Sequence, residues 1–378
     1  MTRAEALLAL NLIPQIGPVR ARRLIAACGG PEQVLAARAG DLAGVDGVSP
    51  ALAQAVTGWR EQTNLEGELA KIQARGLTVL TEDDPLYPPL LRGIHDAPLV
   101  LYVWGRLATR DHRAIGVVGS RQATLYGLNA AKRLSYQIAY AGYTVVSGLA
   151  RGIDTAAHEA ALAAQGRTVA VIGSGLGRLY PPENQALAER IAENGAVISE
   201  YPVDRVADKQ TFPYRNRIVA GWCTGLLVVE APERSGALIT AQQAVEQGRT
   251  VYAVPGPIDK PGSIGCNRLI QQGAKLVMDG SDMLEDLGEL LPTSAPGTAP
   301  AAARAPAALS LDEQILLEAF GQTETHVDIL IRDSGLTAAT VNVCLMRLEM
   351  KRLIRPLPGR YYSRVGAGAA DSVPSLLR

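Results

Sequence analysis

The chain has 378 residues, of which 47% are hydrophobic and 20% charged, a composition typical of globular proteins and too apolar for a disordered one. Lysine plus arginine equals aspartate plus glutamate, so the formal net charge is zero and a uniformly basic nucleic-acid binder is excluded; any such site has to be a local patch. The four cysteines are scattered without a CxxC pair, and no apolar run reaches the roughly 18 residues of a membrane span. We therefore expect a cytoplasmic protein without a membrane span, a disulfide framework or a structural metal.

Residues 1–65 predict a helical domain of short helices broken by glycine. Two segments, PQIGPVRA at 14–21 and DGVSPALA at 46–53, are similar to the turns of helix-hairpin-helix motifs, which offer backbone N–H groups to DNA phosphates. Gln15 and Ser49 stand where that motif has glycine. A structural or partner-binding role is therefore an equally good interpretation of this domain.

Residues 66–290 alternate short apolar strands with stretches long enough for a helix. This pattern predicts an α/β fold with a Rossmann-like parallel sheet covered on both faces. The predicted strands are 114–118, 143–146, 168–172, 196–199, 226–229 and 250–254. Because ligands bind at the carboxyl ends of such strands, the residues that follow each strand are the candidates.

Glycine, serine and arginine recur in the loops that follow these strands. The candidates there are Gly119, Ser120, Arg121, Gly148, Arg151, Gly173, Gly175, Ser235 and Gly236. Glycine lets a backbone approach a ligand closely, and N–H groups at helix N-termini favour anions, so we predict a phosphate-lined edge. A dinucleotide cofactor is disfavoured, because the first strand is followed by GSRQATLYG and not by GxGxxG.

The segment FPYRNR at 212–217 follows Lys209 by three residues. An aromatic residue among cations suits single-stranded nucleic acid, because bases stack on the ring and phosphates pair with the charges. The alternative is that Phe212 belongs to the core and that the arginines are exposed or pair with Glu200 or Glu230.

The last part of the chain predicts a linker, a winged-helix domain and a tail. Residues 291–308 are rich in proline and alanine and nearly uncharged, as in linkers. Residues 309–365 read as three helices and a hairpin, a winged-helix pattern with helices at 311–320, 327–332 and 340–353, Thr337 as an N-cap and a wing at 355–364. Acidic and basic residues balance in this domain, so contact with DNA and contact with protein both stay open. Residues 366–378 form the tail.

Seven segments of the chain, taken in order, resemble the bacterial DNA-processing protein A (DprA/Smf) family. They are VVGSRQATLYG (117–127), VSGLARGIDTAAHEAAL (146–162), AVIGSGLGRLYPPEN (170–184), ISEYP (198–202), FPYRNRIVAG (212–221), LLVVEAPERSGALITAQQAVEQGRTVYAVPG (226–256) and GCNRLIQQGAKLV (265–277). The resemblance implies an extended Rossmann-like domain in a non-enzymatic protein without a cofactor. Such a protein binds single-stranded DNA, protects incoming strands in natural transformation, loads the RecA recombinase in homologous recombination and forms a homodimer.

The resemblance also implies roles for particular residues. The single-strand site would include Arg121 in the GSR turn, and the other positions carried over are Lys209, Phe212, Arg215 and Asn216. Thr124, at the predicted start of a helix, and Arg217, in the same FPYRNR segment, are further candidates for this site. The dimer surface would include Leu269, Ile270 and Leu276. Many relatives have a lysine where this chain has Pro182-Glu183, and whether Arg178 replaces it stays open.

Two further hypotheses compete. The predicted sheet is similar to that of nucleotide phosphoribohydrolases of the lysine-decarboxylase-like group, in which case Glu200 or Glu230 could be catalytic. This chain has SGALIT at 235–240 where that group has PGGxGTxxE, and His158 lies in a predicted helix where it packs rather than catalyses. The third hypothesis is a protein-interaction scaffold that uses the two end domains.

Overall fold

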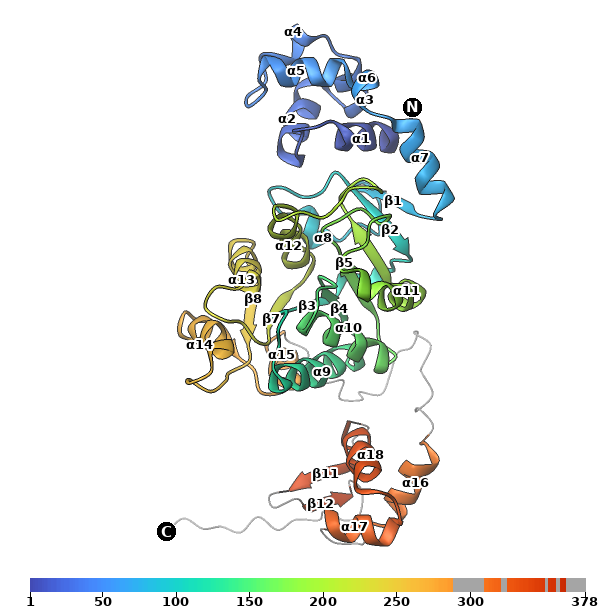
Figure 1. Ribbon diagram of the computed structural model, residues 1–378, viewed down its shortest axis with the longest axis vertical. Coiled ribbons are helices and arrows are strands. Elements are labelled where there is room, and N and C mark those ends of the chain that lie inside the picture. The colour runs from blue at the N-terminus through green and yellow to red at the C-terminus, as the bar shows by residue number, and fades with distance from the viewer. Residues whose placement is uncertain (288–308, 321–324, 351–352, 358–360, 365–378) are drawn as a thin grey trace, which may run out of the picture. The chain divides into compact units, whose positions relative to one another are not determined.

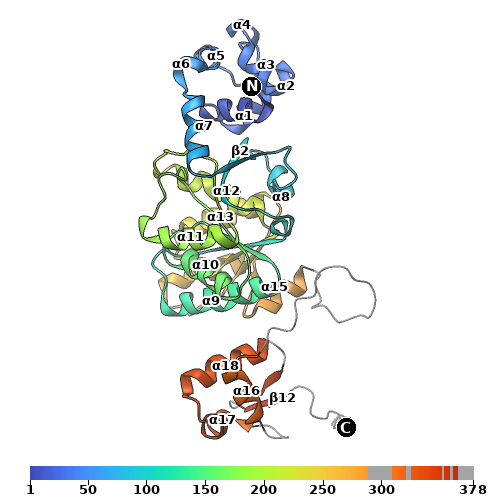
Figure 2. The same cartoon turned by 90° about the vertical axis from the view of Figure 1, so that its right-hand side faces the viewer.

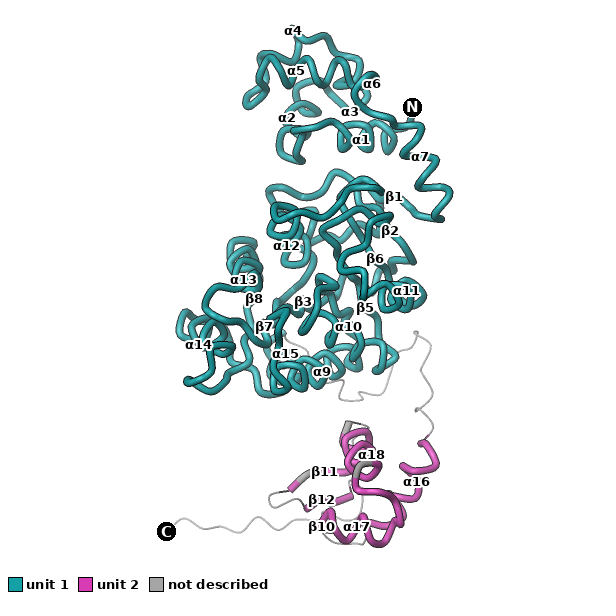
Figure 3. Tube along the Cα trace, in the orientation of Figure 1, with its two compact units in different colours: residues 1–293 teal, residues 294–378 magenta. Residues whose placement is uncertain are grey.

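The structure is a computed structural model that describes residues 1–287, 309–320, 325–350, 353–357 and 361–364. The chain divides into two compact units, residues 1–293 and 294–378 (Figure 3). The predicted linker at 291–308 and the predicted tail at 366–378 lie outside the described residues, and the domain boundaries within unit 1 stay a prediction. Within the described ranges, no helix is both long and apolar enough to cross a membrane.

Unit 1 begins with a group of short helices, as the sequence predicts. They are α1 (Arg3–Leu12), α2 (Pro18–Cys28), α3 (Pro31–Ala36), α4 (Ala39–Leu42), α5 (Pro50–Thr57) and α6 (Trp59–Gln62). Thr2 and Glu5 form a capping box at the start of α1. In the first hairpin turn Gln15 adopts a φ of 66°, the left-handed region that favours glycine, and Arg20 Nη1 donates to its carbonyl oxygen at 3.0 Å. Gln15 therefore takes the backbone conformation that glycine favours at this position.

A nine-stranded sheet forms the centre of unit 1, with strand order β1-β2-β6-β5-β4-β3-β7-β8-β9. The strands are β1 (Thr78–Thr81), β2 (Val100–Gly105), β3 (Ala114–Val118), β4 (Thr144–Ser147), β5 (Thr168–Val171), β6 (Ala196–Ser199), β7 (Gly225–Val228), β8 (Thr250–Ala253) and β9 (Lys275–Leu276). Strands β3 to β9 run parallel to one another, and all six predicted strands are confirmed to within one or two residues. The prediction missed β1 and β2, which add an antiparallel edge beside β6.

Helices cover both faces of this sheet, as expected for parallel strands (Figures 1 and 2). One face carries α9 (Leu125–Tyr140), α10 (Ile153–Ala163), α11 (Gln185–Asn194) and α15 (Gly280–Asp286), and the other carries α8 (Pro89–Arg92), α12 (Thr211–Trp222), α13 (Gly236–Glu246) and α14 (Ile264–Gln271). Helix α7 (Leu65–Ala74) precedes β1, and the 3-10 turns are η1 (Thr109–His112), η2 (Pro182–Asn184) and η3 (Pro261–Ser263). Neighbouring residues on one strand point to opposite faces of the sheet. Val145 packs in the core on the α9 and α10 side, and Val146 packs in the core on the α12 side.

The strand order reverses at β3, because the chain runs outward through β4, β5 and β6 and then returns to β7 on the other side of β3. The carboxyl ends of β3 and β7 thus form the crevice in which doubly wound sheets bind ligands. Glu230, which follows β7, connects the two strand ends. Its carbonyl oxygen accepts from Ser120 N at 2.7 Å, and its carboxylate accepts from Thr124 Oγ1 at 2.6 Å. Thr124 in turn caps α9 by accepting from Gly127 N.

Unit 2 has the predicted winged-helix arrangement. It contains α16 (Leu311–Glu318), α17 (Val327–Ser334), α18 (Ala338–Met350) and a sheet of order β10-β12-β11 made by β10 (Thr325–His326), β11 (Ile354–Leu357) and β12 (Tyr361–Arg364). Leu316, Leu330 and Leu348 are fully buried in its core. Thr337 Oγ1 accepts from Thr340 N at 3.2 Å, the predicted cap, although α18 begins two residues before the predicted start.

Removal of Asp111 should destabilise unit 1. Asp111 is 1% exposed, accepts two hydrogen bonds of 2.7 Å from the Arg167 guanidinium and accepts a third from Thr144 Oγ1. Loss of one partner of a buried ion pair costs about 3–5 kcal/mol, so we expect Asp111→Ala to lower the free energy of unfolding by that order in urea titrations. Glu233→Ala, which breaks an exposed pair with Arg268, is the control and should cost less than about 1 kcal/mol. Equal losses in the two variants would contradict the expectation.

Candidate nucleic-acid interface

Two aromatic rings and a guanidinium gather at the carboxyl edge of the sheet. The Arg121 Cζ atom lies 4.9 Å from the centre of the Phe212 ring, and the Tyr180 ring lies 5.6 Å from that ring at an angle of 52°. The three side chains come from the loop after β3, from the first turn of α12 and from the loop after β5. Phe212 is half-buried, so the alternative that places it in the core does not hold.

Local structure fixes the position of the Phe212 ring. Asp208 Oδ1 accepts from the amides of Gln210 and Thr211 at 2.8 and 2.9 Å and so shapes the turn that leads into α12. A Cβ atom at Gly173 would lie 3.1 Å from Phe212 Cδ1, a distance tighter than ordinary contact, so glycine leaves the room that the ring needs. Lys209 is exposed in the same turn.

Arg215 lies one helical turn after Phe212 and is 4% exposed. Its Nη1 donates to Gly148 O at 2.7 Å and to Val171 O, which joins the carboxyl ends of β4 and β5. Burial lowers the pKa of Arg215 to about 10, against the attraction of Asp154. Asp154 accepts from Gly148 N at 3.1 Å, and burial raises the pKa of its carboxyl. The Arg215 guanidinium therefore holds the loops that follow β4 and β5 in place from inside the protein.

Arg217 is also buried, at 3% exposure. Its Nη2 atom lies 2.7 Å from both carboxylate oxygens of Glu200, its Nε lies 3.0 Å from Asp96, and its guanidinium stacks 4.0 Å from the Tyr214 ring. For Arg217 the structure thus agrees with the alternative in which an arginine pairs with Glu200. Since Glu230 binds Thr124, both carboxylates considered for catalysis accept hydrogen bonds from groups of the chain itself.

The glycine-rich loops do not all present their amides to solvent. Ser120 N donates to Glu230 O, Gly148 N donates to Asp154, and Gly175 N donates to Arg205 O at 2.8 Å. We expected such amides to line a phosphate site, but these three are engaged within the fold. The positive charge of this edge is therefore carried by exposed side chains, those of Arg121 and Lys209, whereas the exposed Arg151 pairs with Glu183.

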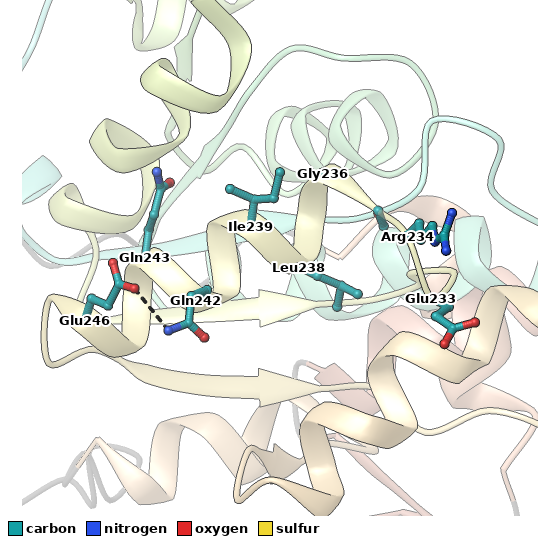
Figure 4. A pocket seen from close by; sticks show the side chains of 9 residues that line it. Glu233, Arg234, Gly236, Leu238, Ile239, Gln242, Gln243 and Glu246 are labelled. Carbon is teal, nitrogen blue, oxygen red and sulfur yellow. Dashed lines mark hydrogen bonds between the residues drawn. The ribbon is translucent and has the colours of Figure 1, made fainter. Parts of the chain in front are cut away.

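A groove of about 720 Å³ runs along α13 (Figure 4). Its lining includes Ser235, Gly236 and the apolar side chains of Leu238 and Ile239, and Figure 4 shows the last two projecting from the helix. None of Arg121, Lys209 and Phe212 lines it. The structure thus places Ser235 and Gly236 in this groove, and the other candidates around the sheet edge.

Comparison with known proteins relates the chain to one family. Residues 78–288 match the family of DNA recombination-mediator protein A, and residues 300–360 match the DprA winged helix domain. Protein Smf of Synechocystis is 34% identical over 94% of this chain and 98% of its own length, and Protein Smf of Escherichia coli is 38% identical over 79% and 80%. The chain belongs to the DNA recombination-mediator protein A family.

Two solved structures of family members match the fold. The X-ray structure of DNA processing protein A from Streptococcus pneumoniae has a TM-score of 0.67 and 37% identity over 76% of this chain and 98% of that one. The Helicobacter pylori member, solved to describe how it binds single-stranded DNA, has a TM-score of 0.51 and 26% identity over 56% of this chain and 95% of that one. The family resemblance, the Rossmann-like sheet and the winged helix predicted from the sequence are confirmed.

Tyr180 is the residue near the site that the sequence analysis did not select. It is 40% exposed, and it contacts Phe212 although the two residues are far apart in the chain. The available signal was an aromatic residue in a loop after a predicted strand, and position after a strand was also part of the signal that pointed to Arg121. Glu183, which lies where the resemblance implies a lysine, pairs with Arg151. Arg178, the suggested substitute, is exposed, and together with Lys71, whose effect is larger, it lowers the pKa of the Asp204 carboxyl.

His158 is fully buried in α10, as expected for a packing residue. Its Nδ1 atom is 2.7 Å from Thr168 Oγ1, which itself donates to Val145 O. Because the Thr168 proton is used in that bond, Nδ1 of the neutral ring is the donor.

The buried histidine predicts a loss of stability in acid. Burial, and then the charge of Arg215, lowers the pKa of His158 from 6.5 to about 3. The unfolded chain therefore binds this proton first, so the stabilisation is complete above pH 6.5 and is lost as the pH falls towards 3. We expect the difference in unfolding free energy between wild type and His158→Gln to shrink by up to about 1.4 kcal/mol per pH unit in that window. Urea titrations at about pH 7 and about pH 4.5 measure it; a difference that stays constant contradicts the expectation.

Proposed function

We propose that unit 1 binds single-stranded DNA at the edge formed by Arg121, Phe212 and Tyr180. The observation that carries the proposal is the guanidinium 4.9 Å from an accessible ring, with a second ring 5.6 Å away. Aromatic rings stack on any base, and cations attract any phosphate, so binding is tolerant of sequence. Bases of a duplex are stacked on each other, and the site therefore selects single strands.

The proposal gives different roles to the cations of this edge. Arg121 and Lys209 are exposed and neutralise phosphates, and Phe212 stacks on a base. Arg215 and Arg217 act as positioning residues, since their guanidinium groups are buried against carbonyl and carboxylate oxygens. Asn216 accepts from Arg215 Nε at 3.2 Å and joins this supporting set.

Substitutions at the exposed positions separate stacking from charge. We expect Arg121→Ala and Lys209→Ala each to reduce the slope of log affinity against log salt by about 0.7, the value of one phosphate contact on a single strand. Phe212→Ala should weaken binding by roughly 1–3 kcal/mol with an unchanged slope, because stacking carries no net charge. Fluorescence anisotropy with labelled single-stranded and duplex oligonucleotides over a salt series measures both quantities.

Lys132→Ala is a matched control, because Lys132 is an exposed lysine on α9 and lies two turns after the helix start at the sheet edge. It should leave affinity and slope close to wild type. Unchanged affinity in Arg121→Ala and Lys209→Ala would show that the site assignment is wrong. Equal affinity for duplex DNA would show that the site does not select single strands.

The wider role is part of the same proposal. Membership of a recombination-mediator family supports protection of incoming single strands in natural transformation and the loading of RecA on them in homologous recombination. We assign no catalytic step, because Glu200 and Glu230 serve the fold. The four cysteines, all of which lie in the described ranges, are thiols and not disulfides, which fits a cytoplasmic location.

A homodimer through the far end of the sheet also belongs to the proposal. Among the residues that the structure describes, strand β9 ends the strand order and pairs only with β8, which leaves its other edge for a second copy. Leu276 on β9 is 45% exposed and Met278 is 69% exposed, whereas Leu269 and Ile270 of α14 are half-buried against the core.

Leu276→Asp should disrupt this dimer, because a charge on the edge strand disfavours pairing of two apolar surfaces. We expect sedimentation equilibrium to give a dimer for wild type and a monomer for the variant. Val245→Asp, at a 58% exposed position on α13, is the control and should stay dimeric. A monomeric wild type, or a variant that remains dimeric, would contradict this interface.

A further inference from the structure

One exposed cation of the proposed DNA edge is already neutralised within the chain. Arg151, in the loop after β4, forms an ion pair through Nε with the carboxylate of Glu183. The Arg151 side chain is 56% exposed and that of Glu183 is 46% exposed, so the pair lies at the surface. The hydrogen bond from Arg151 lowers the pKa of the Glu183 carboxyl, which is therefore ionised at neutral pH.

Glu183 is held opposite Arg151 by its neighbour in the chain. Asn184 is 7% exposed, and its Nδ2 donates to Leu149 O at 2.8 Å and to Thr155 Oγ1 at 3.0 Å. Leu149 belongs to the same loop as Arg151, so these bonds tie the loop after β4 to the 3-10 turn that carries Glu183. The carboxylate is thus positioned beside the guanidinium by a buried anchor.

The ion pair is continuous with the aromatic rings of the site. Glu183 and, to a smaller extent, the Tyr180 hydroxyl raise the pKa of the Arg151 guanidinium, and the Tyr180 ring contacts Phe212, which Arg121 covers. A strand with a base against Phe212 and Tyr180 therefore brings a phosphate towards Arg151.

We infer that the Glu183 carboxylate occupies the place of a DNA phosphate on Arg151 and thereby limits the affinity of the site for single-stranded DNA. This inference rests on the proposed function and adds a residue that sets affinity and salt dependence. An exposed ion pair is weak in water, so a phosphate can compete with the carboxylate for the guanidinium. The displaced carboxylate stays beside the incoming phosphate and repels it, which offsets the gain from that contact.

A double-mutant cycle tests the inference with four full-length proteins: wild type, Glu183→Gln, Arg151→Gln and the double variant. Glu183→Gln should raise the affinity for a labelled oligothymidine about three-fold or more at ~50 mM salt and steepen the salt slope by about 0.7, as one added phosphate contact does. That gain should shrink about three-fold between ~50 and ~200 mM salt. Arg151→Gln should cancel the gain, so the double variant binds like Arg151→Gln alone.

Glu189→Gln on α11 is the matched control, because it removes an exposed carboxylate and changes the net charge by the same amount. It should leave affinity and slope near wild type. Thermal melting of each variant checks the fold, and Glu183→Ala repeats the test with a side chain that cannot bond Arg151.

The outcomes separate the inference from the proposed function. If wild type binds the oligonucleotide and Glu183→Gln does not bind more tightly, the inference alone is wrong. A gain that persists without Arg151, or one that Glu189→Gln reproduces, is a general charge effect and also overturns it. If wild type does not bind single-stranded DNA at all, the proposed function fails and the inference fails with it.

Discussion

The buried guanidinium of Arg215 holds the candidate site together. It donates to the carbonyl oxygens of Gly148 and Val171, and its charge is balanced by Asp154. The same residue anchors the first turns of α12, where Phe212 lies. The loop that carries Arg151 and the ring proposed to stack on a base thus take their positions from one internal ion.

The cations near this edge fall into two classes with different physical tasks. Arg215 and Arg217 lie inside the protein, where a charge is tolerated only because carbonyl and carboxylate oxygens surround it. Arg121 and Lys209 lie at the surface, where water and phosphate can reach them. This division explains how a chain with no net charge presents a basic, aromatic edge.

The carboxylates near the switch point follow the same principle. Glu200 neutralises Arg217, and Glu230 fixes the start of α9, so each stabilises the elements around the site. Glu183 differs, because it lies at the surface and faces a cation that a phosphate could use. A sheet of this topology can place acidic groups at its carboxyl edge for chemistry, for structure or for competition with a ligand, and burial and partners distinguish these uses.

The sequence by itself determined six strands of the parallel part of the sheet, the winged helix and the family, because apolar runs, turn residues and motif order are local properties. The strand at 114–118 and the cap at Thr337 need only near neighbours, and the structure has both. Tertiary structure decided which arginines are buried, that Tyr180 meets Phe212, and that β1 and β2 add an antiparallel edge. Arg215 finds its partner 67 positions away at Gly148, and no local pattern of charge or apolarity encodes such a contact.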